Sequence, residues 1–175
     1  NWKYEKISVM ADYNKITTSE KGEMVMIDHM KKKGLKYIGR VKGDLKLQLP
    51  ECGRFMTFKV KTDIWNVPGK YLDMPFGRMW VEGRDSGKLF IEFKHNSSPS
   101  GIAVTESTGY QYYLPHFKEM WYIPTKKLIK LISDYDFREV TQKESSFSTR
   151  TGYLIPKEEF KKHFNVYKID YEWQD

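Results

Sequence analysis

The sequence predicts an α+β or mixed-sheet α/β fold, in which helices flank a central mixed, mostly antiparallel sheet. Three observations support this: a helical pattern near the start ends at a glycine, short segments of alternating apolar and polar residues follow, and a second helical pattern begins at a proline. The 175 residues are enough to bury a core, and they contain no repeat, low-complexity tract or clear linker. We therefore expect one domain over residues 1–175.

The first predicted helix runs from about Ser19 to Lys33. Thr17 and Glu20 have the spacing of a capping box, in which two side chains satisfy free backbone N–H groups at the start of a helix. Gly34 follows the last turn, a position where glycine commonly ends a helix.

One side of this helix is expected to face the core. Ile27 and Met30 supply its apolar side, and Glu20 and Glu23 each precede one of them by about two helical turns. Both carboxylates should therefore lie on the buried side. Gly22 has no side chain and should allow a neighbouring segment to approach closely.

The middle of the chain predicts strands joined by turns. The clearest is Phe55–Lys61, in which apolar residues alternate with polar ones. With the two segments before it, this strand should form a three-stranded antiparallel unit. The remaining predicted strands are Lys36–Val41, Asp44–Leu49, Lys88–Lys94, Gly109–Leu114 and Glu119–Ile123.

The C-terminal part predicts two further helices. One begins at Pro124 and continues to about Ser133, and the other runs from Pro156 to about Phe164. Between them, the sequence indicates a loop over Gln142–Arg150 and a short strand at Gly152–Ile155.

The charge balance favours a polyanionic partner. The chain carries 30 Lys and Arg residues against 23 Asp and Glu, a formal net charge of +7. Nucleic acid is the expected partner, and an acidic membrane surface is a less common one for such a chain. No segment has the roughly 18 apolar residues of a membrane span, so no membrane partner is expected.

The cysteine content indicates the compartment. Cys52 is the only cysteine, which excludes an internal disulfide and a cysteine-based zinc site. The first residues, Asn1–Met10, lack the apolar core of a signal peptide. A reducing, cytoplasmic setting is therefore expected.

Several residues have the chemistry of metal-dependent phosphodiester cleavage. Such sites hold Mg²⁺ or Mn²⁺ with carboxylates and use a lysine to orient or deprotonate the attacking water. Asp44 opens one predicted strand and Lys61 closes the next, while Glu20 and Glu23 could reach in from the helix. Structural roles are the alternative: Asp44 as a turn residue after Gly43, the strand lysines as a solvated face, and the glutamates as favourable helix N-terminal charges.

A set of short motifs strengthens the nuclease interpretation. They are Lys59-Val60-Lys61-Thr62-Asp63, then Ser86-Gly87-Lys88-Leu89-Phe90-Ile91-Glu92-Phe93, then Ser100-Gly101-Ile102-Ala103-Val104-Thr105, then Tyr122-Ile123-Pro124. In this order and spacing they resemble a group of small phage and bacterial proteins of the PD-(D/E)XK nuclease superfamily. The resemblance runs from about Glu23 to Ile132 and implies a restriction-endonuclease-like core.

The resemblance assigns roles residue by residue. Asp44 corresponds to the first metal-binding acid and Lys61 to the motif lysine. Glu23 or Glu20 corresponds to the helix acid, and the implied cofactor is Mg²⁺ or Mn²⁺.

The sequence departs from the family pattern at Lys59, which stands where the motif has an acid. A charged lysine does not ligate Mg²⁺, and three explanations compete. In the first, the missing ligand comes from elsewhere, with Glu92 as the leading candidate. Alternatively, Glu92-Phe93-Lys94 is itself the acid-x-lysine motif, with Asp73 or Asp85 as its first acid. A third possibility is a domain that binds nucleic acid and has lost catalysis.

The predicted function is a metal-dependent nuclease that hydrolyses phosphodiester bonds in DNA, with a non-catalytic nucleic-acid-binding domain on the same fold as the alternative. RNA stays open as a partner, and a homodimer would suit cutting of both strands. If the chain is phage-encoded, its setting is the host cytoplasm. The expected nucleic-acid contacts are Lys59, Arg40, Lys42, Lys94 and Ser100, and two basic clusters, Lys31–Lys33 and Lys126–Lys130, could meet phosphates as well.

Overall fold

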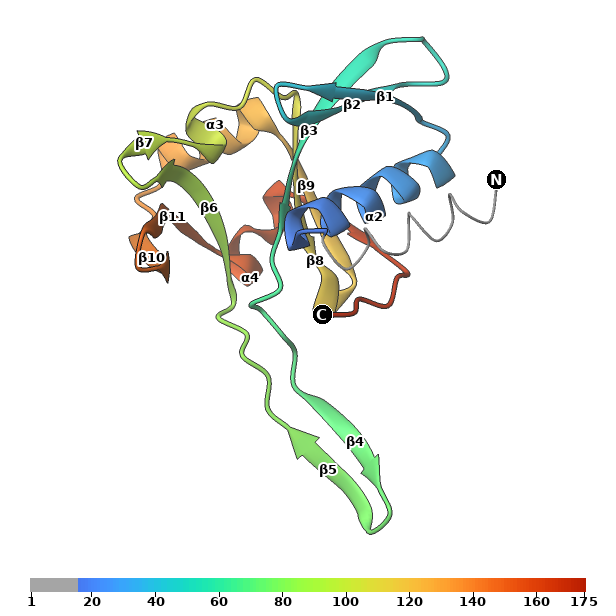
Figure 1. The fold of residues 1–175 in the computed structure, drawn as a ribbon, viewed down its shortest axis with the longest axis vertical. Coiled ribbons are helices and arrows are strands. Elements are labelled where there is room, and N and C mark those ends of the chain that lie inside the picture. The colour runs from blue at the N-terminus through green and yellow to red at the C-terminus, as the bar shows by residue number, and fades with distance from the viewer. Residues whose placement is uncertain (1–15) are drawn as a thin grey trace.

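The computed structural model describes residues 16–175, and it has an α+β architecture (Figure 1). The predicted segment Asn1–Met10 lies outside the described residues. Three helices accompany one six-stranded, one four-stranded and one two-stranded sheet in the described chain. The elements are α2 (Thr18–Lys32), β1 (Lys36–Val41), β2 (Asp44–Gln48), β3 (Phe55–Thr62), β4 (Lys70–Met74), β5 (Gly77–Val81), β6 (Lys88–His95), β7 (Ser98–Pro99), β8 (Gly109–Leu114), β9 (Glu119–Pro124), α3 (Thr125–Asp134), β10 (Glu139–Ser145), β11 (Ser148–Pro156), α4 (Lys157–Phe160) and β12 (Asn165–Lys168).

The six-stranded sheet has the order β1-β2-β3-β8-β9-β12. Its neighbours run antiparallel except β3 and β8, which pair in parallel, so the predicted mixed, mostly antiparallel sheet is confirmed. The predicted three-stranded unit β1-β2-β3 is also confirmed. Lys42 and Gly43 join β1 to β2 with φ values of 51° and 82°, the two positive values that a two-residue type I′ turn requires.

Two hydrophobic clusters cover the two faces of this sheet. On one face, Val25, Met26 and Met30 of α2 pack with Phe58 and Val60 of β3. On the other face, Tyr110 and Tyr112 of β8 pack with residues of β6, β11, α3 and α4. Helices flank the sheet as predicted, but much of the second face is covered by the four-stranded sheet β10-β11-β6-β7.

The approach of α2 to β3 depends on Gly22. A Cβ atom at Gly22 would lie 1.7 Å from Oγ1 of Thr62, which confirms the predicted close approach at this glycine. The buried face of α2 consists of Gly22, Val25, Met26 and Met30. Glu20 is exposed, so its predicted place on the buried side is wrong, because the buried stripe is rotated by about one residue from the predicted one.

The predicted loop over Gln142–Arg150 is wrong in part. β10 and β11 form an antiparallel hairpin there, with Gln142 opposite Arg150. Most residues of β10 are exposed on both faces, so the segment lacks the apolar alternation that marks a strand in the sequence. Its extended conformation comes from pairing with β11. Strands β4, β5 and β12 were likewise not predicted.

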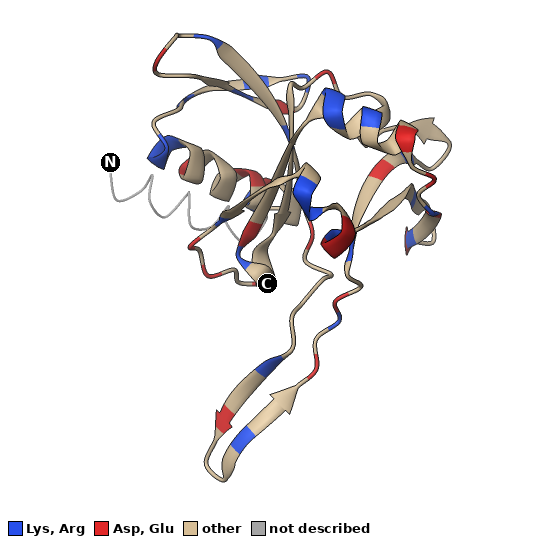
Figure 2. Cartoon of the chain, turned by 180° about the vertical axis from the view of Figure 1, so that it is seen from behind, with Lys and Arg blue, Asp and Glu red and all other residues tan. Residues whose placement is uncertain are grey.

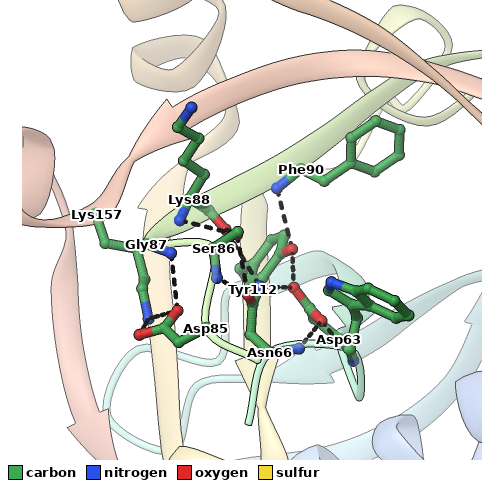
Figure 3. Close-up of polar contacts among 10 residues, drawn as sticks. Asp63, Asn66, Asp85, Ser86, Gly87, Lys88, Phe90, Tyr112 and Lys157 are labelled. Atoms are coloured by element: carbon green, nitrogen blue, oxygen red, sulfur yellow. Dashed lines mark hydrogen bonds and ion pairs between the residues drawn. The ribbon is translucent and has the colours of Figure 1, made fainter. Parts of the chain in front are cut away.

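β4 and β5 form a two-stranded arm that projects away from the rest of the described chain (Figure 1). Buried polar contacts fix the root of this arm (Figure 3). The carboxylate of Asp63 accepts hydrogen bonds from the backbone N–H groups of Trp65 and Asn66, from the Asn66 side chain at 2.8 Å and from the Tyr112 hydroxyl at 2.5 Å. The Tyr112 hydroxyl in turn accepts the backbone N–H of Phe90 at 3.0 Å.

The same network reaches the chain that returns from the arm. The Asn66 side-chain oxygen accepts the backbone N–H and the hydroxyl of Ser86, at 2.8 and 2.9 Å (Figure 3). Nearby, Lys157 of α4 forms an ion pair with Asp85 at 3.2 Å. Both ends of the arm are therefore tied to β3, β8, β6 and α4.

No helix within residues 16–175 combines the length and the apolar character needed to span a bilayer.

We expect Tyr112→Phe to lower the free energy of unfolding by about 1–3 kcal/mol, because it removes one of the four hydrogen bonds to the buried Asp63 carboxylate and the acceptor of the Phe90 backbone N–H. Tyr113→Phe is the matched control on the same strand, since the described residues provide no hydrogen-bond partner for its buried hydroxyl. Denaturant unfolding of both variants checks this. Equal losses in the two variants would contradict the role assigned to Asp63.

Candidate functional site

Three adjoining cavities follow the polar face and the C-terminal end of β3. We name them after one lining residue each: the Asp44 cavity of about 170 Å³, the Lys61 cavity of about 440 Å³ and the Trp65 cavity of about 660 Å³. Lys59 lines the first two, and Lys61 lines the last two. Further lining residues are Thr105 and Ser107 in the first, Glu92, Glu144 and Arg150 in the second, and Asp63, Phe90 and Arg138 in the third.

Asp44 is buried at the first position of β2, and its carboxylate already has partners. One oxygen accepts hydrogen bonds from the hydroxyls of Thr105, at 2.8 Å, and Ser107. The other oxygen lies 3.9 Å from Nζ of Lys59. The side chain that replaces the expected acid thus supplies positive charge next to the predicted metal ligand.

Glu23 of α2 belongs to the same charged cluster. Its carboxylate forms an ion pair with Arg40 of β1, and it interacts electrostatically with Lys59 and Asp44. Burial raises the pKa of Glu23 in spite of the Arg40 hydrogen bond. The structure therefore brings together four predicted residues: Glu23, Arg40, Asp44 and Lys59.

Glu92 of β6 occupies the Lys61 cavity and is held from two sides. It accepts hydrogen bonds from the Ser100 hydroxyl at 2.8 Å and from the Arg150 guanidinium at 2.6 Å, and Arg150 also contacts Glu144. Burial alone would raise the pKa of Glu92, but these hydrogen bonds and the nearby positive charges hold that pKa below its ordinary value. Gly101, with φ of 51°, allows the loop after Ser100 to touch β6, since a Cβ there would lie 2.2 Å from the Glu92 carbonyl oxygen.

Lys61 has no comparable partner among the described residues. Its Nζ lies 5.7 Å from the centre of the Phe90 ring, and no carboxylate among residues 16–175 lies within ion-pair distance of it. Burial lowers the pKa of Lys61, and the charge of Glu92 offsets this only in part. A perturbed titratable group in a cavity marks a candidate functional residue.

The N-terminus of α2 borders the same cavity. Residues 17–19 line it together with Lys59 and Lys61. Thr17 caps the helix by accepting the N–H of Glu20 at 3.2 Å, as the predicted capping box requires for the threonine. The first N–H groups of the helix and its dipole give this end a partial positive charge.

Two other predicted site residues, Glu20 and Lys94, are exposed and line none of the three cavities. Lys42 lines the Asp44 cavity, where it forms an ion pair with Glu106. The alternative motif Glu92-Phe93-Lys94 is not assembled either: Asp73 pairs with Arg78 on the arm, and Asp85 pairs with Lys157.

Sequence reasoning missed Arg150 and Glu144, which lie in the hairpin that was predicted as a loop. It also missed Thr105 and Ser107 as partners of Asp44. The contacts of Arg150 with Glu92 and of Thr105 and Ser107 with Asp44 join positions 58 to 63 residues apart along the chain, so no local spacing could reveal them.

The carboxylates do not form a ready site for Mg²⁺ or Mn²⁺ as they are arranged. Residues 16–175 contain no group of three or more His, Cys, Asp or Glu side chains placed to hold a metal ion. The oxygens of Asp44 and Glu92 are occupied by hydroxyl donors and paired with Lys59 and Arg150. Divalent cations favour several free oxygen ligands.

No protein-family model matches this sequence, and neither a curated protein nor a solved structure matches the chain. The likeness to PD-(D/E)XK nucleases therefore stays a prediction from the motifs.

We expect Lys61→Met to raise the free energy of unfolding at pH 7, because it removes a charge whose burial is unfavourable. The gain should be full below the lowered pKa of Lys61 and should shrink as the pH rises through it, since the wild-type lysine then loses its own charge in the folded state. Denaturant unfolding between pH 7 and 10 measures this, with the exposed Lys32→Met as the control. A variant less stable than wild type at pH 7 would show that attraction to Glu92 outweighs burial.

Proposed function

We propose that this chain binds DNA and that the Lys61 cavity receives a phosphate of the backbone. The observation that supports this most is the meeting of Lys61, Arg150 and the N-terminus of a 15-residue helix in one cavity. A helix N-terminus favours anions, and lysine and arginine are the usual partners of phosphate.

The energetics of Lys61 favour an anionic ligand. A desolvated cation without an ion pair is unfavourable, and a bound phosphate would supply the missing countercharge. Lys59 and Arg150 are already paired with carboxylates, so Lys61 is the cation most available to a ligand. Binding of a phosphate would therefore give Lys61 the countercharge that its described surroundings in the free protein do not provide.

The wider charge distribution adds non-specific attraction. Lys and Arg segments lie on the C-terminal end of α2, on α3 and along the arm (Figure 2). Together with the net charge of +7, they would attract DNA from a distance and make its affinity dependent on salt.

We also propose that the chain has a restriction-endonuclease-like core. A helix followed by three antiparallel strands, with a further strand parallel to the third, supports a restriction-endonuclease-like core. In this chain the connection between the parallel strands β3 and β8 contains the arm and β6.

We expect wild-type affinity for a DNA oligonucleotide to fall steeply as salt rises, and Lys61→Met to weaken binding about tenfold at low salt, the effect of one charge-assisted hydrogen bond. The matched control is Lys130→Met on α3, whose lysine pairs with Asp134 and lines none of the three cavities. Fluorescence anisotropy at several salt concentrations measures both. Equal affinities of the two variants would remove the Lys61 cavity from the binding site.

Metal-dependent hydrolysis of DNA is the second candidate function. The observation that favours it is that Asp44 and Lys61, which correspond to positions of the nuclease motif, and Glu92, the candidate for the missing ligand, border adjoining cavities. Hydrolysis with Mg²⁺ or Mn²⁺ would first require Asp44 and Glu92 to exchange their present partners.

A nicking assay on plasmid and single-stranded DNA with Mg²⁺, Mn²⁺ or EDTA tests this candidate. If it is correct, wild-type protein cuts DNA only when metal is present. Lys61→Ala then lowers the cutting rate at least 100-fold, as expected for loss of a general base or charge-stabilising group. Lys59→Glu increases the cutting rate, because it places a carboxylate beside Asp44. Lys59→Gln is the control, since it removes the charge without adding a ligand. If wild type and Lys59→Glu both bind DNA but neither cuts it, the nuclease function is contradicted and only the binding function is supported.

A further inference from the structure

The Lys61 and Trp65 cavities adjoin each other. Both are lined by Lys61, Thr62, Ile64 and Glu144, so these four residues form their shared boundary. We call the two together the Lys61–Trp65 channel. Six cations line it against three carboxylates: Lys59, Lys61, Lys88, Arg138, Lys143 and Arg150 against Asp63, Glu92 and Glu144.

An exposed aromatic side chain lies in the wider half of the channel. Trp65 is 63% exposed, although it sits in a lined cavity next to the buried Phe90 and Tyr112. Its exposed indole ring, among these cations, is available for stacking a planar group.

Trp65 is also held in place before any ligand arrives. Its backbone N–H donates to Asp63 at 2.9 Å, and its carbonyl accepts Nε of Arg84 at 2.8 Å. The Arg84 guanidinium lies 4.7 Å from the centre of the indole ring. The backbone anchor and the cation over the ring limit the freedom of the side chain, so stacking a planar ligand on it costs little ordering entropy.

We propose that the channel binds a single-stranded polynucleotide, with one phosphate at Lys61 and a neighbouring base stacked on Trp65. The inference rests on the proposed function and names its substrate class. In a duplex, each base is stacked between its neighbours and cannot offer its face to a side chain inside a cavity. Grooves that combine cations with exposed aromatic residues are the common way of binding unpaired strands.

The test compares four fluorescent probes of equal length: single-stranded DNA, the same DNA with abasic sites in place of bases, duplex DNA and single-stranded RNA. The abasic strand keeps the phosphates and loses the stacking groups. Wild-type protein should bind the base-containing single strand at least fivefold more tightly than the abasic strand and the duplex, in line with the contribution of one stacked base.

Variants locate the stacking group. Trp65→Ala should lower affinity for the base-containing strand at least fivefold and leave affinity for the abasic strand unchanged, while Trp65→Phe should restore most of the loss. Tyr167→Ala, at an exposed tyrosine of β12 outside the channel, is the matched control. RNA bound as tightly as DNA would support the inference and extend it to both polymers.

The two proposals fail in different ways. Equal affinity for abasic, base-containing and duplex DNA, with no effect of Trp65→Ala, would overturn single-strand stacking and leave phosphate binding at Lys61 in place. If none of the four probes binds at low salt, the proposed function itself is overturned, and the channel with it.

Discussion

The buried carboxylate of Asp63 is the constraint on which the site depends. It accepts four hydrogen bonds, two from backbone N–H groups and two from the side chains of Asn66 and Tyr112. A buried carboxylate is tolerable only with such satisfaction, so the end of β3 cannot shift without losing it. Lys61 lies two residues before Asp63 and Trp65 two residues after it, so this one group sets the positions of both proposed contacts and of the arm root.

Around this fixed point, most charges neutralise one another. Asp44 faces Lys59, Glu23 faces Arg40, and Glu92 faces Arg150. Partly buried pairs of this kind order a polar region, but they contribute little binding capacity of their own. Lys61 is the exception, since its pKa is lowered by burial and only partly restored by Glu92. Lys61, a cation with no ion pair among the described residues and beside a helix N-terminus, is therefore the feature that most directly supports an anionic ligand.

The sequence predicted the parts of the fold that rest on local pattern. The helix capped by Thr17, the β1-β2-β3 unit and the strands carrying Lys61 and Glu92 all follow from periodicity and turn chemistry. It did not predict β10, which is extended only because it pairs with β11, nor the arm, whose exposed residues bury no apolar face. Arg150 was missed as well, because it contacts Glu92, which lies 58 residues away in the sequence, only once β11 has paired with β6.

The central claim is that polynucleotide phosphates bind at the Lys61 cavity rather than at the lysine clusters on α2 and α3. Nuclear magnetic resonance of isotope-labelled protein, titrated with a short single-stranded oligonucleotide, tests it most directly. The account predicts that the largest shifts fall on the backbone amides of Thr18 and Ser19 and on the side chains of Lys61 and Arg150. Shifts confined to residues 31–33 and 126–130 would contradict it.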